Sequence, residues 1–131
     1  CSSDLMLEAA SCELPVICPE WSGYLDFMTL KDGNKSKSAF AKVDYDLNYV
    51  QKEAVWQGVI EADSMWAYPK QGSLKMRLRE VYKDYGRFKS QAKKLSSQIK
   101  TTLTPENIAK KYCEEVLETV NKPTIHDMVN F

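Results

Sequence analysis

The chain has 131 residues, of which 44% are hydrophobic and 27% are charged, and its formal net charge is zero. This composition is typical of one small globular domain and excludes a collagen-like, coiled-coil or disordered chain. No apolar run approaches the roughly 18–20 residues that cross a bilayer, and residues 1–14 lack the basic segment of a signal peptide. We therefore expect a cytoplasmic protein without a transmembrane segment.

Charge is distributed unevenly along the chain. Residues 1–69 carry a net charge of −6, residues 70–111 carry +9 and residues 112–131 carry −3. A basic helical segment is most often a solvated face, and it can also bind a polyanion such as nucleic acid or an anionic membrane. We expect no nucleic-acid partner and keep a polyanion-binding surface as the alternative.

The first elements in the chain are a helix and a buried strand. Small and apolar residues at helical spacing predict a short helix over residues 4–12. The apolar run 15–19 is bounded by prolines and predicts a short strand of a parallel sheet. A turn is expected at 21–23, followed by a short helix or loop at 24–28.

The next segment predicts a loop and a longer strand. Residues 31–38 are polar and rich in turn formers, which predicts a loop. Residues 41–49 alternate between apolar and polar side chains, which predicts one strand with a single buried face. Residues 51–69 are ambiguous in secondary structure and end at Pro69.

Three helices are predicted after Pro69. Ser73 is the expected cap of the first, which ends at Gly86, and its apolar side is formed by Leu74, Leu78, Val81 and Tyr82. The second presents Phe88, Ala92, Leu95 and Ile99. The third opens at Thr104-Pro105-Glu106. It covers about 105–121, and we expect its apolar stripe (Ile108, Tyr112, Val116 and Val120) to pack on another element. If that element belongs to a missing domain, part of the stripe is expected to be exposed in this chain.

This order predicts an α/β fold with an incomplete Rossmann-like sheet and C-terminal helices. Two evident strands are too few for a complete doubly wound sheet. We divide the chain into an α/β part over residues 1–69 and a helical part over residues 70–122. The first residue is Cys1 rather than Met, and the first Met lies inside the expected first helix, which suggests a piece of a longer chain.

No metal site or cofactor is expected. The four cysteines form no C-x-x-C pair and His126 is the one histidine, whereas a zinc site needs about four convergent ligands. We expect reduced and mostly buried thiols, and we read His126 as a tail residue rather than a catalyst. Phosphate-binding loops of the P-loop or Rossmann type are absent from the sequence.

The most informative stretch for function is residues 1–28. The first amides of a helix have no partners within the helix and favour an anion such as phosphate. Glu8 follows one turn into the expected helix. Ligands of open α/β sheets bind where strands end and helices begin. The alternative is a structural helix with a surface Glu8.

A resemblance sharpens this interpretation. The run Leu7–Ile17 (LEAASCELPVI) resembles a segment of retaining GT-B glycosyltransferases with the pattern Leu-Glu-Ala-Met-Ala-Cys-Gly-x-Pro-Val-Ile. In that family the segment follows a Glu-x7-Glu motif. The polar turn 20–23 and the motif Trp66–Pro69 are similar to later parts of the family, as are Leu74, Leu78 and Arg79 in the next helix. The likeness extends in order over most of residues 1–120.

The resemblance implies a binding site for a nucleotide-diphosphate sugar. Glu8 would accept hydrogen bonds from the ribose, and the amides of Asp4 and Leu5 would lie near the diphosphate. The chain differs from the family at Ser3 and Glu13, where glycines are usual, and at Asp4, where an apolar residue is usual. No catalytic residue can be carried over.

The expected function is therefore that of a glycosyltransferase fragment, the C-terminal part of the donor-binding domain. The parent enzyme would transfer a sugar from a nucleotide-diphosphate donor to an acceptor that the sequence does not identify. The resemblance implies that an N-terminal domain of the same chain is missing, so we expect the fragment to be inactive alone. The alternative is a non-enzymatic α/β interaction module whose basic helices bind a polyanion.

Overall fold

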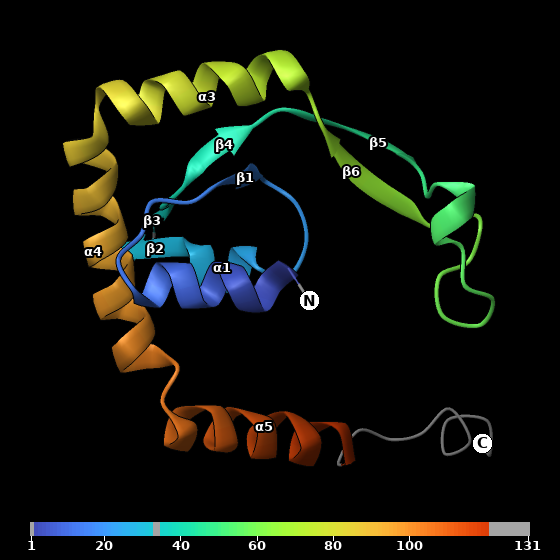
Figure 1. Cartoon of the computed structure of the whole chain (residues 1–131). Coiled ribbons are helices and arrows are strands. Elements are labelled where there is room, and N and C mark those ends of the chain that lie inside the picture. Colours follow the sequence, from blue (N-terminus) through green and yellow to red (C-terminus); the bar gives the residue numbers. More distant parts are fainter. Residues whose placement is uncertain (1, 33–34, 121–131) are drawn as a thin grey trace. The chain divides into compact units, whose positions relative to one another are not determined.

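A computed structural model describes residues 2–32 and 35–120 and shows a mixed α/β fold with small sheets (Figure 1). The helices are α1 (Ser2–Ser11), α2 (Leu25–Met28), the 3-10 helix η1 (Lys52–Ala54), α3 (Gln71–Lys83), α4 (Tyr85–Thr102) and α5 (Pro105–Val120). The strands are β1 (Ile17–Pro19), β2 (Thr29–Asp32), β3 (Lys35–Ser38), β4 (Ala41–Val43), β5 (Tyr45–Tyr49) and β6 (Met65–Pro69). The strands pair in twos, so each described sheet has two strands.

The chain divides into two compact units, one up to Ile99 and one from Lys100 onward. The division falls inside α4. Residues 121 and 122 of the expected helical part, and His126, lie outside the described residues.

The predicted buried strand is present as the second half of its expected range. β1 pairs in parallel with β4, with Ile17 opposite Ala41 and Pro19 opposite Val43. Cys18, Ala41 and Val43 are all buried. A parallel pair needs a crossover between its strands, and here α2 and the β2–β3 hairpin provide it.

The expected single strand over residues 41–49 is wrong, because the chain changes partner at Asp44. β4 belongs to the parallel pair, whereas β5 pairs antiparallel with β6, with Tyr45 opposite Pro69. The expected buried face continues only through β4. Tyr49 on β5 is 67% exposed.

The expected loop over residues 31–38 is also wrong, because its ends form a hairpin. β2 and β3 pair antiparallel, with Thr29 opposite Ser38. On its other side β2 is held by Gln98 of α4. The Gln98 side chain accepts from the Lys31 amide (2.9 Å) and donates to the Thr29 carbonyl (2.8 Å), much as a neighbouring strand would.

The core of the first unit lies between α1, the parallel pair and α4. The predicted buried face of α4 is confirmed, since Phe88, Ala92, Leu95 and Ile99 are at most 6% exposed. Two α4 side chains also satisfy carbonyls at the end of α1. The Ser96 hydroxyl donates to the Ser11 carbonyl (2.8 Å), and the Lys89 ammonium donates to the Glu13 carbonyl (2.9 Å).

The predicted boundaries of the first C-terminal helix are wrong at both ends. α3 begins at Gln71 and ends at Lys83, and Gly86 lies in the first turn of α4. Ser73 does not cap α3. It is buried, and its hydroxyl oxygen accepts from the Asp44 amide (3.0 Å), so the serine serves the neighbouring strand connection instead.

The second unit contains α5, whose predicted start is confirmed. The Thr104 hydroxyl accepts from the Asn107 amide (3.2 Å), which is the hydrogen bond of a helix N-cap. The expected exposure of part of its apolar stripe is seen in the described residues. Ile108, Tyr112 and Val116 are 53%, 70% and 42% exposed.

Candidate functional site

The residues predicted to bind a nucleotide-sugar lie in the first two turns of α1. Since α1 begins at Ser2, the amides of residues 2–4 belong to the turn that has no carbonyl partners within the helix, and Leu5 follows directly. Asp4 and Leu5 are exposed, and Glu8 is exposed one turn further along. The structure thus places all three at the surface of one helix.

The direction of α1 relative to the parallel pair brings this turn to the carboxyl ends of the strands. Figure 1 shows α1 running in the opposite direction to β1, with the N-terminal end of α1 on the side where β1 and β4 end. Open α/β sheets bind ligands along this edge. The turn 20–23 and Asp44 follow β1 and β4 at the same edge.

Two tyrosines fix the turn that follows β1. The Tyr24 hydroxyl donates to the Pro19 carbonyl, and the Tyr45 hydroxyl donates to the Glu20 carbonyl (3.2 Å). Burial, with the adjacent Cys18, raises the pKa of Tyr24 to about 12. Burial likewise raises the pKa of the Cys18 thiol to about 12, so both groups are neutral at physiological pH. The backbone of this turn is therefore held by hydrogen bonds from two tyrosine hydroxyls.

A pocket of about 460 Å³ lies elsewhere in the first unit, between the β2–β3 hairpin, β4 and the adjoining ends of α3 and α4. Its charged lining residues are Glu20, Lys37, Lys42, Arg77, Glu80 and Arg87. The predicted donor residues Asp4, Leu5 and Glu8 do not line it. The pocket and the N-terminal turn of α1 are therefore two separate candidate sites.

The charged groups of the pocket form a connected network. Glu80 accepts from Arg77 Nη1 (2.6 Å) and from Arg87 Nη2 (2.7 Å). These two guanidinium groups lower the pKa of Glu80. Glu20 is ion-paired with Lys42 and accepts from the Ser38 hydroxyl (2.7 Å), and these contacts lower its pKa. Both carboxylates therefore stay ionised at neutral pH.

Sequence reasoning missed this pocket because its residues come from segments far apart in the chain. The spacing of Arg77 and Glu80 is the one local signal, since residues three apart face each other on a helix. The approach of Arg77 to β4 is not local. Arg77 Nε donates to the Lys42 carbonyl (2.7 Å), and these residues lie 35 positions apart.

Neither a metal cluster nor a disulfide occurs in the described part of the chain. Cys12, Cys18 and Cys113 are free thiols. Cys18 is buried, but Cys12 and Cys113 are exposed, so the expectation of mostly buried thiols is wrong for these two. None of the helices within residues 2–32 and 35–120 has the length and hydropathy needed to cross a membrane.

Comparisons of the chain with protein-family models, with curated proteins and with solved structures found no match.

Proposed function

We propose that this chain contributes the donor-binding part of a glycosyltransferase that uses a nucleotide-diphosphate sugar. The N-terminal turn of α1 holds the diphosphate through its backbone amides and the helix dipole, and Glu8 accepts hydrogen bonds from the ribose. The segment from α1 to β4 is then part of a Rossmann-like GT-B domain. The reaction of the whole enzyme is glycosyl transfer, with retention of configuration as the resemblance implies.

The observation that carries this proposal is the end of α1. The Leu14 amide donates to the Ala9 carbonyl (2.9 Å), and the Glu13 amide donates to the Ala10 carbonyl (3.1 Å). Together these two bonds form a Schellman motif. Glu13 has a φ of 62°, in the left-handed region that favours glycine. Position 13 therefore has the conformation that suits the glycine of the family pattern, although the residue is Glu.

The order and direction of the elements also support the proposal. α1 leads into β1, β1 pairs in parallel with β4, and the short helix α2 lies between them in the chain. This arrangement brings a helix N-terminus and two strand ends to one edge (Figure 1). Phosphate groups bind at such helix N-termini through the backbone amides and the helix dipole.

A nucleotide titration of the 131-residue chain tests the proposal. Uridine, guanosine and adenosine diphosphates are added separately, and backbone amide signals are followed by NMR. We expect one of the three to shift the amides of residues 2–5 and to leave those of α5 unchanged. Absence of any shift in the first turn with all three nucleotides would refute the proposal.

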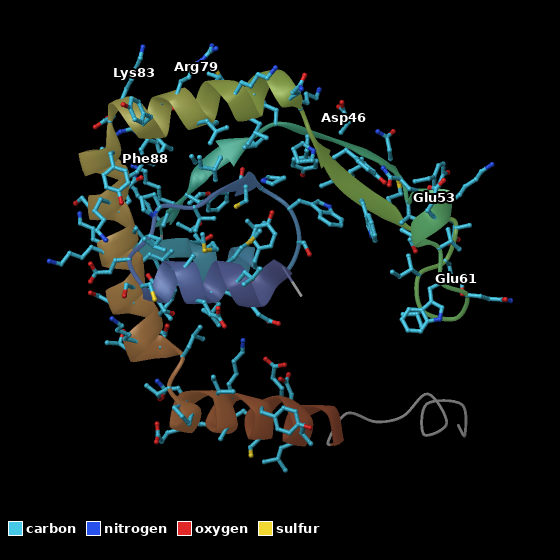
Figure 2. The ribbon with its side chains drawn as sticks, in the orientation of Figure 1. Asp46, Glu53, Glu61, Arg79, Lys83 and Phe88 are labelled. Atoms are coloured by element: carbon cyan, nitrogen blue, oxygen red, sulfur yellow. The ribbon has the colours of Figure 1, made fainter. Side chains whose placement is uncertain are left out.

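Variants separate the two roles assigned to α1. Glu8→Gln should weaken nucleotide binding about tenfold, because a charged acceptor of the hydroxyl hydrogen bonds is lost. Asp4→Asn should strengthen it several-fold, because a carboxylate in the first turn repels the diphosphate. Glu53→Gln is the control, since Glu53 lies on η1 at the far end of the β5–β6 hairpin (Figure 2).

The polyanion-binding alternative has less support. Of the twelve basic residues in 70–111, six lie within 4.0 Å of a carboxylate: Lys70, Arg77, Arg87, Lys89, Lys110 and Lys111. Ion pairing reduces the field that these helices present to a polyanion. A salt-dependent affinity for heparin exceeding that for the nucleoside diphosphates would favour the alternative.

A further inference from the structure

The pocket beside α3 and α4 has an excess of positive charge. Four cationic side chains line it, Lys37, Lys42, Arg77 and Arg87, against the carboxylates of Glu20 and Glu80. Asp84 lies outside the lining and binds Arg87 Nε (2.6 Å), which removes part of the excess. Since both lining carboxylates are already held by cations, the pocket as a whole favours an anionic ligand.

The two arginines are fixed before any ligand arrives. The Arg87 guanidinium lies 4.4 Å from the centre of the Phe88 ring and binds both Glu80 and Asp84. Arg77 is held by the Lys42 carbonyl and by Glu80. An anion that binds here does not need to order either side chain, so little conformational entropy is lost on binding.

Each arginine keeps donors for a ligand. The bonds to protein groups use Nε and Nη1 of Arg77, and Nε and Nη2 of Arg87. Within the described part of the chain, Nη2 of Arg77 and Nη1 of Arg87 have no acceptor. A tetrahedral oxyanion can accept from both, since guanidinium groups match the geometry of phosphate oxygens.

The uncharged lining residues and the volume of the pocket indicate which kind of molecule carries the anionic group. Thr29, Ser36, Ser38 and Gln91 also line the pocket, which offers hydroxyl and amide groups to a polar ligand. Phe40 and Phe88 are at most 6% exposed, so neither presents a ring face on which a nucleobase could stack. A volume of about 460 Å³ lies at the lower end of the range for small-molecule sites.

We propose that this pocket binds a small sugar phosphate, with the phosphate on Arg77 and Arg87 and the sugar hydroxyls on the polar wall formed by β3 and Gln91. Lys37 supplies a further positive charge at the rim. The site does not include Asp4, Leu5 or Glu8, so it stands independently of the proposed donor site.

The test uses the 131-residue chain and three probes at constant ionic strength: glucose 6-phosphate, glucose and inorganic phosphate. Side-chain Nε–H signals of the arginines are followed by NMR. Arg79 is the internal control, because it lies on α3 but extends away from β4 (Figure 2). We expect glucose 6-phosphate to shift Arg77 and Arg87 but not Arg79, and to bind more tightly than inorganic phosphate. Glucose alone should not bind.

Matched variants test the rim charge. Lys37→Ala should weaken glucose 6-phosphate binding about fivefold, which is the upper limit of the contribution of one partly exposed charge to affinity. Lys35→Ala, on the same strand but outside the pocket lining, should leave affinity unchanged. Arg87→Lys keeps the charge but removes the planar fork, and it should weaken binding more than Lys37→Ala does.

Several outcomes would overturn the inference. One is absence of binding at about 10 mM glucose 6-phosphate, a concentration that detects even millimolar affinity. Another is an equal shift of Arg79, which would mark a general charge effect. Equal affinity for inorganic phosphate and glucose 6-phosphate would refute the sugar phosphate, and equal effects of Lys37→Ala and Lys35→Ala would refute the pocket.

Discussion

At the scale of single residues, Ser73 shows how one hydroxyl links two elements. It lies in the first turn of α3, buried, and accepts from the Asp44 amide where the chain passes from β4 to β5. The Asp44 carbonyl in turn accepts from the Lys70 amide (2.7 Å). The corner at Asp44 is thus fixed on both of its backbone groups by residues near the start of α3.

Ser73→Ala should therefore destabilise the first unit by about 1–2 kcal/mol, because the Asp44 amide loses its acceptor in a part-buried position. Chemical denaturation of wild type and variant measures the difference. Ser90→Ala is the control, since Ser90 is exposed on α4 and should cost less than about 0.5 kcal/mol. Equal loss in both variants would contradict the role assigned to Ser73.

The cysteines should differ sharply in reactivity. Burial raises the pKa of Cys18 to about 12, so its thiol stays protonated below that pH, and thiolate is the nucleophile. At pH 8, iodoacetamide should label the exposed Cys12 and Cys113 and leave Cys18 unmodified until the protein is unfolded. Peptide mass spectrometry of native and denatured samples measures this. Equal labelling of all three in the native state would show that the first unit opens readily.

At the scale of elements, local patterns predicted helices better than strand partners. The spacing of Phe88, Ala92, Leu95 and Ile99 predicted the buried face of α4 correctly, because helical periodicity is a property of the segment itself. The alternation of apolar and polar side chains over 41–49 could not reveal that the strand changes its pairing partner at Asp44. Side chains alternate with a period of two residues in both β4 and β5, although the two strands belong to different sheets.

The hairpin formed by β2 and β3 was missed for a similar reason. Its polar residues are typical of a loop, but Gln98 satisfies backbone groups of β2 from 67 and 69 residues away. The candidate sites likewise include one part that local sequence predicts and one part that it does not. The exposed positions of Asp4, Leu5 and Glu8 follow from one helix, whereas the pocket network depends on the packing of α3 against β4.

The end of α1 offers a test at this scale. Glu13→Gly should stabilise the first unit by up to about 1 kcal/mol, because a left-handed φ strains a residue that has a Cβ. Glu13→Ala keeps the Cβ and should not increase stability. Both variants lose the long ion pair between the Glu13 carboxylate and Lys89 (3.8 Å), so the difference between them reports the relief of backbone strain. Thermal unfolding monitored by circular dichroism compares the three proteins. A gain in the alanine variant equal to that of glycine would rule out strain as the cause.

At the scale of the whole molecule, the apolar residues that are buried in the described part of the chain belong to the first unit. Leu95 is 1% exposed in its core, whereas Leu117 on α5 is 60% exposed. Leu95→Ala should cost about 2–5 kcal/mol of unfolding free energy, the range for truncating a buried leucine. Leu117→Ala should cost less than about 0.5 kcal/mol. Urea titrations of the two variants provide the comparison, and a similar cost for both would mean that α5 is covered in solution.

The β2–β3 hairpin lies within the chain segment that connects β1 to β4, and this placement affects the folding rate. Joining β1 to β4 closes a long loop, and the entropy of closure rises with loop length. The β2–β3 hairpin lies within that loop, and the Met28 carbonyl at its base accepts from the Ala39 amide (2.9 Å). Formation of the hairpin therefore brings the two ends of the loop closer together. Hairpins form in about 1–10 μs. Substitutions that weaken this hairpin should therefore slow the folding rate, whereas substitutions on the β5–β6 hairpin, which lies outside the loop, should act mainly on the unfolding rate.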